Sequence, residues 1–299
     1  MAKRRALLVA NRRSLAGATD LSDGLDRLER AGIELRRHSV DDPLSIPEII
    51  RNEGPDVDLM VIGGGDGTMN IAADALVELG KPVGIIPIGT ANDLARTLQI
   101  PTTVPEACAV IAAGHTRAVD LGRANGKHFF NVASIGLAAE VTRHHQGARK
   151  KWLRVLSYPL SVWDAFKTTR PFRAWLRCDE QELRIRAIQI TVGNGRHYGG
   201  GMTIAEDAAI DDQHLDVYCL KPLSFWGLLI LFPALRLGRL KDREPILVTR
   251  GREVEVRTRR RLRVNTDGEL TTRTPVLFDI AAHALDVFAP RVGSGEGTR

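Results

Sequence analysis

The sequence has little cysteine and no long hydrophobic run, and each shortage excludes a class of protein. Three widely spaced cysteines without a CxxC pair argue against a disulfide framework and against a zinc site: Cys108, Cys178 and Cys219. The apolar stretch 223–237 contains Pro233 and Arg236 and is shorter than the roughly 20 residues that a membrane-spanning helix needs. We interpret it as a buried core helix in preference to an interfacial one. These features predict a cytoplasmic protein.

Aromatic residues are also scarce, whereas positive charge is in excess. The formal net charge is +6 and the pI is about 9.5, with basic clusters at 149–151 and 257–263. Such a balance favours anionic partners, which include nucleotide phosphates, an anionic membrane and nucleic acid. Aromatic residues make up 5% of the chain and are not interleaved with the basic ones, so nucleic acid is the least expected partner. Peripheral contact with an anionic membrane is an expectation from charge.

A chain of 299 residues with 43% hydrophobic residues is long enough for two domains. Up to residue 122, short apolar runs alternate with segments of helical period, which is typical of a parallel sheet covered by helices. We expect strands at 6–10, 33–40, 58–62 and 83–88, and helices near 21–30, 46–52, 70–79, 91–98 and 105–113.

From residue 123 to 290 the pattern is mostly β, and this region is predicted to form a sandwich beside the α/β domain. Residues 291–299 are rich in glycine, and we expect them to be disordered. Strands are expected at 127–133, 172–178, 183–192, 215–220, 253–257, 262–265 and 276–280, and helical insertions at 152–167 and 223–240.

The strongest motif is a glycine-rich loop between a buried strand and a helix, Gly63-Gly64-Gly65-Asp66-Gly67-Thr68. Glycines let the backbone approach a polyphosphate, and the N-terminus of the following helix favours negative charge. An ordinary turn needs one or two glycines, so four around one aspartate favour a phosphate site. The loop lacks the lysine of the P-loop pattern and is not the dinucleotide GxGxxG. Asp66 indicates a contact with the metal of a nucleotide or a proton relay.

A second junction of the same kind follows at Gly89-Thr90-Ala91-Asn92-Asp93. Because the carboxyl ends of parallel strands meet at one edge of the sheet, the two junctions are expected to lie together. The alternative for Thr90, Asn92 or Asp93 is an ordinary helix N-cap.

Together, the two junctions resemble the catalytic domain that diacylglycerol, sphingosine and ceramide kinases share. Two later segments match further motifs of this family in the right order, Asn194 to Met202 and Thr266-Asp267-Gly268-Glu269. The resemblance implies a nucleotide-binding domain similar to those of NAD kinases and phosphofructokinases, followed by a β-rich lipid-substrate domain.

The resemblance also implies roles for residues. Glu269 would be the catalytic base, and Asp66 would act with the magnesium ion of the nucleotide; without the family, Asp267-Gly268-Glu269 is a polar turn. An ATP site is expected from these residues: Asn11, Ser39, Gly64, Gly65, Gly67, Thr68, Met69, Asn70 and Thr90.

The small bacterial members of this family also hold a structural Mg²⁺ in a loop similar to 209–216. Carried over by position, Asp212 would supply a carboxylate, and Ala209 and His214 would supply backbone carbonyls. The usual Asp-Gly is Asp212-Gln213 here, so the loop lacks the glycine that favours its turn. Ile71 replaces a glutamate of the family, Ser39 a threonine, and Arg12 the proline of Asn-Pro.

The prediction is therefore a kinase that transfers the γ-phosphate of Mg-ATP to a lipid hydroxyl such as that of diacylglycerol. Two alternatives stay open: a kinase for NAD or another soluble substrate, and a lipid- or nucleotide-binding module without catalysis. A pocket for an acyl chain needs only apolar residues, so the sequence does not identify the lipid. It also allows a homodimer.

Overall fold

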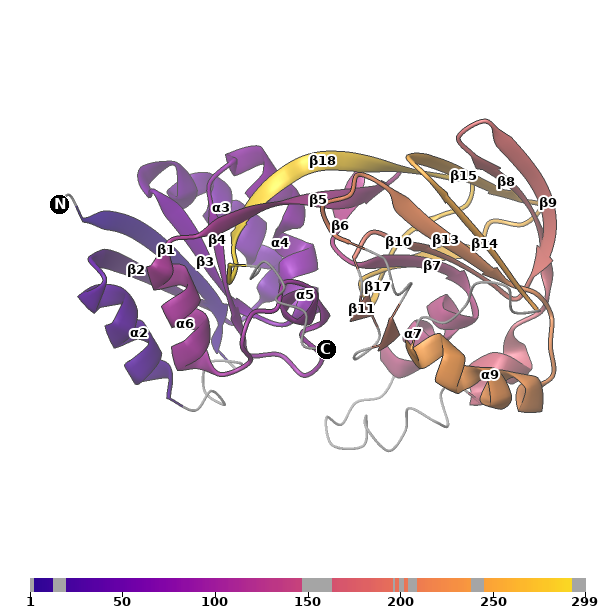
Figure 1. Ribbon diagram of the computed structural model, residues 1–299, viewed down its shortest axis with the longest axis horizontal. Coiled ribbons are helices and arrows are strands. Elements are labelled where there is room, and N and C mark those ends of the chain that lie inside the picture. The colour runs from indigo at the N-terminus through magenta and orange to yellow at the C-terminus, as the bar shows by residue number, and fades with distance from the viewer. Residues whose placement is uncertain are drawn as a thin grey trace, which may run out of the picture. The chain divides into compact units, whose positions relative to one another are not determined.

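The computed structural model describes residues 3–12, 20–146, 163–195, 197–198, 202–203, 209–237 and 245–291 (Figure 1). The basic cluster at 149–151, most of the predicted helix 152–167, and residues 292–299 lie outside these ranges. The chain divides into two compact units. The first comprises Met1–Val119 together with His283–Arg299, and the second comprises Asp120–Ala282.

The first unit is built on a parallel sheet with the strand order β2-β1-β3-β4. The neighbouring strands run in register, with Ala10 opposite both Ser39 and Gly63. The last part of β18 adds a further parallel pair through Val287 and Val83. The strands are β1 (Arg4–Asn11), β2 (Ile33–Val40), β3 (Leu59–Gly64), β4 (Val83–Pro87) and β18 (Val276–Phe288).

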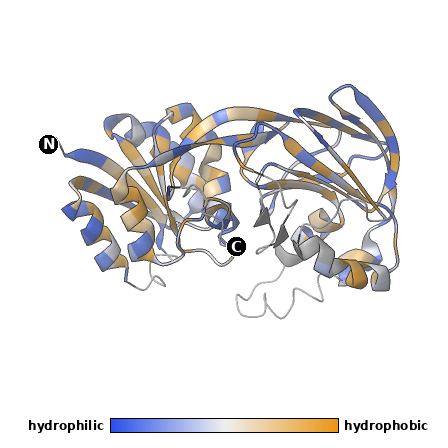
Figure 2. Cartoon of the chain, viewed as in Figure 1, coloured by the Kyte–Doolittle hydropathy of each residue, from blue (hydrophilic) through white to orange (hydrophobic). Residues whose placement is uncertain are grey.

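Helices cover this sheet because each has one apolar side. In α2, Leu25 and Leu28 are buried against α6 and the sheet, while the polar residues between them face solvent. Figure 2 shows both hydrophobic and hydrophilic residues on these helices. The helices are α2 (Leu21–Arg30), α3 (Ile46–Glu53), α4 (Asp66–Leu79), α5 (Asp93–Thr97) and α6 (Val104–Ala113).

The second unit contains a six-stranded antiparallel sheet with the order β14-β13-β10-β7-β16-β17. A second antiparallel layer follows the order β18-β15-β8-β9, and β5 pairs with both β18 and β6. One buried cluster joins the layers, with Ile135 and Val217 from the first and Leu176 and Phe278 from the second. The unit is therefore a β sandwich. Its strands in chain order, besides β18, are β5 (Thr116–Ala124), β6 (Lys127–Phe129), β7 (Val132–Gly136), β8 (Phe172–Cys178), β9 (Gln181–Ala187), β10 (Gln189–Gly193), β11 (His197–Tyr198), β12 (Met202–Thr203), β13 (Leu215–Leu220), β14 (Ile246–Gly251), β15 (Glu253–Thr258), β16 (Arg263–Thr266) and β17 (Glu269–Arg273).

The predicted fold class, a parallel α/β region followed by a β sandwich, is confirmed. The division of the chain differs in detail. The sequence-based division has boundaries at 122/123 and at 290/291, whereas the contacts place the first crossing after Val119 and a second at His283. This crossing was missed because β18 continues to Phe288 through Ala281, Ala282 and His283, which do not alternate like strand residues.

The apolar stretch 223–237 forms α9 (Phe225–Leu237). The prediction of a buried core helix is correct for only one side of it. Leu228 and Leu231 are buried, whereas Trp226, Leu229 and Ile230 are exposed. Among the described residues, no helix is both long and apolar enough to cross a membrane.

Candidate active site

The predicted nucleotide residues of the first unit lie along one edge of its sheet. Asn11 ends β1, Ser39 is the last residue but one of β2, and Gly64 ends β3. Thr90 follows β4, which pairs with β3 through Gly64 and Pro87. All these strands are parallel, so the residues share the carboxyl edge, where ligands of open α/β sheets bind.

Glycines bring the two junctions into direct contact. A Cβ on Gly89 would lie 2.4 Å from the Cα of Gly65, and a Cβ on Gly64 would lie 2.5 Å from the side chain of Thr68. A Cβ on Gly67, in contrast, would meet nothing within 4 Å. Gly64 and Gly89 are therefore required for packing, whereas Gly67 lies beside open space that a phosphate group can enter.

The Asp66 side chain links the two junctions, and the Asn92 side chain shapes the second one. The Asp66 carboxylate accepts a hydrogen bond from the backbone N–H of Leu94 at 3.0 Å. The Asn92 amide donates to the carbonyls of Pro87 and Gly89, both at 3.1 Å, and its oxygen accepts the Gly89 N–H at 3.0 Å. Asn92 also has a left-handed φ of 52°. The sequence placed Asn92 in the second junction, with an N-cap as the alternative. In the structure Asn92 is at the N-cap position of α5, but its side chain makes no capping hydrogen bond and shapes the loop instead.

The start of α4 separates the predicted nucleotide residues into two groups. Gly67 and Thr68 are half-buried at the first turn, where backbone N–H groups and the helix dipole favour an anion. Met69 and Asn70 are only 2% exposed, so their side chains face the interior. We infer that any ligand contact of Met69 comes from its backbone. The residues at the helix start fit a nucleotide phosphate.

In the second unit, Thr266-Asp267-Gly268-Glu269 is the tight turn between β16 and β17, with Thr266 paired to Glu269. Asp267 and Gly268 have φ values of 47° and 91°, which is the pattern of a type I′ hairpin. Glu269 is exposed at the start of β17. The turn thus presents a carboxylate to solvent on a rigid hairpin, which suits a proton acceptor.

Asp267 anchors this turn. Its carboxylate accepts three backbone hydrogen bonds, from Phe130 at 2.6 Å, Asn131 at 2.9 Å and Val132 at 3.0 Å. The buried Asn194 side chain holds the same segment by donating to the carbonyl of Phe130 at 2.7 Å. The sequence placed Asp267 and Asn194 in motifs without assigning them a role.

We predict that Asp267→Ala lowers the free energy of unfolding by about 2–4 kcal/mol, because three N–H groups lose a charged acceptor. Asparagine tolerates a left-handed φ and keeps one acceptor oxygen, so Asp267→Asn should lose less. Chemical denaturation of both variants measures the difference. Equal losses in the two variants would contradict this role of the carboxylate.

The loop expected to hold a structural magnesium ion is Ala209 to Asp216. Gln213 adopts a left-handed φ of 58°, so the loop keeps a glycine-like turn despite the substitution. However, the guanidinium of Arg250 contacts the Asp212 carboxylate, and its Nε lies 3.5 Å from Asp216. The other Asp212 oxygen accepts the His214 N–H at 3.0 Å.

Arg250 already supplies positive charge at Asp212, so the carboxylate has a cationic partner without a magnesium ion. In the part of the chain that the structure describes, no group of three His, Cys, Asp or Glu side chains could hold a metal, but the predicted site needs only one carboxylate and two backbone carbonyls. The ligands Ala209, Asp212 and His214 stay a prediction from the resemblance.

We expect Arg250→Gln to lower the free energy of unfolding by about 1 kcal/mol and to make stability sensitive to Mg²⁺, because two carboxylates lose their cation. The unchanged protein should melt at the same temperature in Mg²⁺ and in EDTA. Arg51→Gln, which breaks a surface ion pair with Glu78, is the matched control and should gain no magnesium response. A clear stabilisation of the unchanged protein by Mg²⁺ without nucleotide would overturn this view.

The cysteines are not nucleophile candidates. All three are free and buried, and burial raises the pKa of Cys108 and of Cys219 to about 12. Burial also raises the pKa of Cys178. Since the thiolate is the reactive form, these thiols are inert in the folded state.

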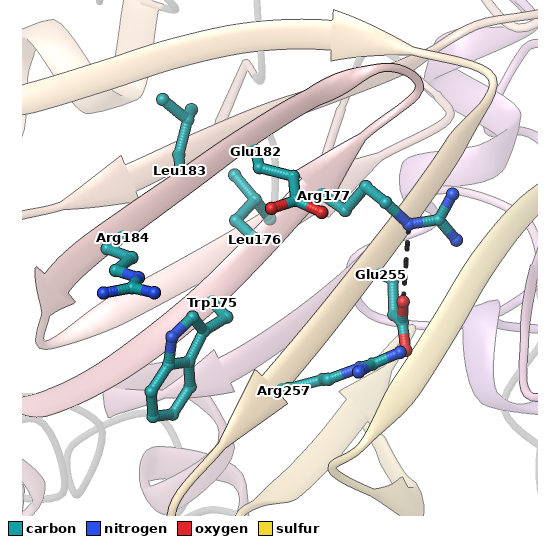
Figure 3. Close-up of a pocket in the computed structure, with 8 residues that line it drawn as sticks. All are labelled: Trp175, Leu176, Arg177, Glu182, Leu183, Arg184, Glu255 and Arg257. Carbon is teal, nitrogen blue, oxygen red and sulfur yellow. Dashed lines mark hydrogen bonds and ion pairs between the residues drawn. The ribbon is translucent and has the colours of Figure 1, made fainter.

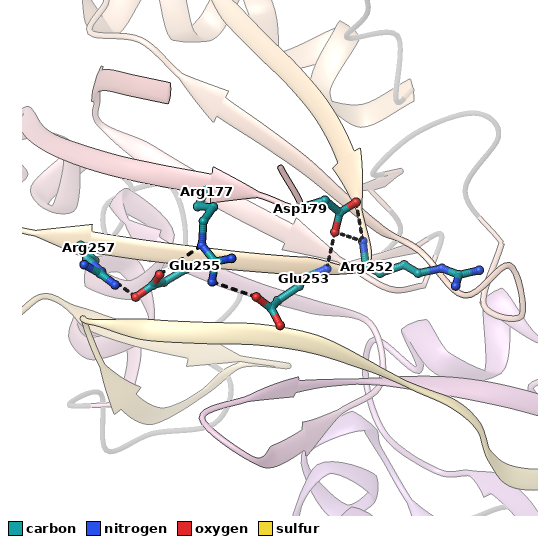
Figure 4. Close-up of polar contacts among 6 residues, drawn as sticks. All are labelled: Arg177, Asp179, Arg252, Glu253, Glu255 and Arg257. Carbon is teal, nitrogen blue, oxygen red and sulfur yellow. Dashed lines mark hydrogen bonds and ion pairs between the residues drawn. The ribbon is translucent and has the colours of Figure 1, made fainter. Parts of the chain in front are cut away.

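A shallow pocket of about 630 Å³ lies on the face of β8, β9 and β15 around Trp175 (Figure 3). No predicted site residue lines it. Arg177 pairs with Glu253 at 2.8 Å and with Glu255 at 3.4 Å, and Arg257 pairs with Glu255 at 2.6 Å (Figure 4). The hydrogen bond from Arg257 holds the pKa of Glu255 below its usual value. These arginines and glutamates are already paired with one another. We therefore assign the surface of this pocket to ion pairs and not to a ligand site.

The fold and these residues define a class: an α/β unit with a glycine-rich loop at the carboxyl edge of its sheet, joined to a β sandwich that presents an acidic turn. Two family models match the chain. The diacylglycerol kinase catalytic domain matches residues 5–124, and the YegS C-terminal NAD kinase beta sandwich-like domain matches residues 131–289. The chain belongs to the diacylglycerol-kinase-like lipid kinase family.

Individual proteins agree with this assignment. Diacylglycerol kinases of Staphylococcus aureus strains RF122 / ET3-1 and JH9 are each 26% identical over 278 residues, which cover 91% of this chain and 87% of theirs. A crystal structure from Bacillus anthracis, assigned provisionally as a diacylglycerol kinase, has a TM-score of 0.82 at 26% identity. That match covers 96% of this chain and 98% of the other.

Proposed function

We propose that the chain transfers the γ-phosphate of Mg-ATP to the hydroxyl of a lipid such as diacylglycerol. The observation that carries the proposal is the pair of junctions at the carboxyl edge of the first sheet. There, Gly67 borders open space at the start of α4, and Asp66 is held at the adjoining junction. Membership of a lipid kinase family supports the acceptor class.

Each residue has a chemical task in this proposal. Gly64, Gly65, Gly67 and Thr68 hold the phosphates through backbone N–H groups and a hydroxyl, while Asn11, Ser39 and Thr90 contact the rest of the nucleotide. The magnesium ion that accompanies ATP would neutralise phosphate charge, and Asp66 is the carboxylate suited to hold it. Glu269 accepts the proton of the acceptor hydroxyl. At the same time the hydroxyl oxygen bonds to the γ-phosphorus, and the bond from that phosphorus to ADP breaks.

The same proposal places the enzyme at a membrane surface from the cytoplasmic side. The excess of positive charge, +6 in total, favours anionic lipids. Each well-placed Lys or Arg adds about 1 kcal/mol of attraction to such a surface. A homodimer is compatible with this proposal.

A panel of acceptors tests the function. Mg-ATP labelled in the γ-phosphate is incubated with mixed micelles that each contain one lipid: diacylglycerol, monoacylglycerol, phosphatidylglycerol, a sphingoid base or a glycolipid. NAD is included as the soluble acceptor. We expect label in one lipid class and none in NAD. Label in NAD alone would replace the proposal by a soluble-substrate kinase, and tight ATP binding with no labelled acceptor would indicate a binding module.

A further inference from the structure

Helix α9 is hydrophobic on two sides, although only one of them packs against the unit. On its inner side, Leu228 and Leu231 are 8% and 7% exposed and join a buried cluster with Tyr218 and Leu220 of β13. These contacts fix the helix to the sheet. Figure 1 shows α9 next to the strands of the second unit. The inner contacts alone account for its place in the fold.

The opposite side of α9 is apolar but exposed. Trp226, Leu229 and Ile230 are 73%, 47% and 81% exposed, and their spacing of three and four residues places them on one stripe. Pro233, also exposed, extends the stripe by one turn. Single exposed hydrophobic residues are common, but a continuous stripe that includes tryptophan marks an interaction surface.

Aromatic rings gather at the N-terminal end of this stripe. The ring of Phe225 lies 4.3 Å from that of Trp163 and 5.5 Å from that of Phe166, and Trp226 adjoins it at 6.1 Å. The Lys167 ammonium lies 4.5 Å from the Trp163 ring centre. Tryptophan with a neighbouring lysine is the combination that favours the boundary between lipid headgroups and acyl chains.

The charge around the stripe indicates the kind of partner. In 163–170 and 221–233, which carry the stripe and the aromatic group, the cationic residues are Lys167, Arg170 and Lys221, and the only acidic residue is Asp164. Apolar side chains flanked by positive charge match an anionic lipid surface, with the apolar groups in the acyl region and the cations among the headgroups.

We propose that the outer face of α9, made of Trp226, Leu229, Ile230 and Pro233, docks the chain on an anionic lipid bilayer. This inference rests on the proposed function, since a lipid acceptor brings the enzyme to a bilayer. The helix lies in the plane of the interface and does not cross it.

Flotation with vesicles tests the surface. The full chain and its Trp226→Gln/Ile230→Gln variant are mixed with two kinds of vesicle. One kind is phosphatidylcholine alone, and the other also contains about 30% phosphatidylglycerol. The control is Leu44→Gln, because Leu44 is 73% exposed and lies in the other unit. Glutamine keeps helix propensity, and the mutated side chains make few internal contacts, so the variant should fold.

We expect the unchanged protein and the control to bind the anionic vesicles, and the double variant to bind about 30-fold more weakly or worse. Equal binding of all three proteins would overturn the proposal. A wild-type dimer that the double variant abolishes, without vesicle binding, would also overturn it, because a second copy would then cover the face.

A second measurement does not depend on the double variant. Lipids brominated in the acyl chain should quench the fluorescence of the unchanged protein more than that of Trp226→Phe, which keeps the apolar contact. Equal fractional quenching would contradict insertion of Trp226. Neither assay uses ATP, so docking without phosphate transfer would reject the proposed function alone, and transfer without docking through α9 would reject this inference alone.

Discussion

Replacing Glu269 by glutamine is expected to lower the rate of phosphate transfer by about 10²–10⁴-fold, because the acceptor hydroxyl loses its proton acceptor. Glutamine has nearly the same shape, and Glu269 is exposed, so the free energy of unfolding should change by less than about 0.5 kcal/mol. ATP affinity should also be unchanged, since the nucleotide residues are assigned to the other unit. Steady-state kinetics in mixed micelles and thermal unfolding measure these effects.

The matched control is Glu180→Gln, because Glu180 is also exposed, belongs to the same unit and lies in the hairpin between β8 and β9. It should retain full activity. A Glu269→Gln enzyme that transfers phosphate at the wild-type rate would remove Glu269 from the mechanism.

The second large effect is expected at Gly89. A Cβ there would lie 2.4 Å from the Cα of Gly65 and 2.6 Å from the Asn92 side-chain oxygen, and backbone atoms at Gly65 cannot rotate away. Gly89→Ala should therefore lower the free energy of unfolding by about 2–3 kcal/mol and separate the two junctions. Because this also displaces Asp66, activity should fall further than stability alone explains.

Gly67→Ala is the control that separates packing from ligand binding. Its Cβ would meet nothing in the protein, and alanine favours the first turn of α4, so stability should be unchanged or higher by up to about 1 kcal/mol. ATP binding should nevertheless weaken, because the added methyl group occupies the space assigned to phosphate. Denaturation and nucleotide titration compare the variants. Unchanged ATP affinity in Gly67→Ala would move the phosphate site elsewhere.

Much of the first unit could be predicted from the sequence because its signals are local. Buried strands such as β3 read as continuous apolar runs, and the glycine loop follows directly. The expectation that the two junctions share an edge rests on parallel topology, and the pairing of Gly64 with Pro87 agrees with it. The strand 33–40 was predicted with the bounds that the structure has.

What the sequence could not reveal depends on contacts between distant residues. Asp267 holds backbone groups 135 or more positions away, and Arg250 lies 38 positions from Asp212. Strands β14 and β17 were not predicted because their half-exposed residues give a weak alternation. The exposed face of α9 was missed because a helix that is apolar all round has no periodic signal to distinguish its two sides.

The central claim is that this chain couples ATP cleavage to phosphorylation of a lipid hydroxyl. The most direct measurement quantifies ADP and phosphorylated lipid together, in one reaction of the unchanged protein with Mg-ATP and diacylglycerol micelles. The account predicts that the two products form in equal amounts and that neither forms in excess without the other. ADP released without phosphorylated lipid, or no reaction with any lipid of the panel, would contradict it.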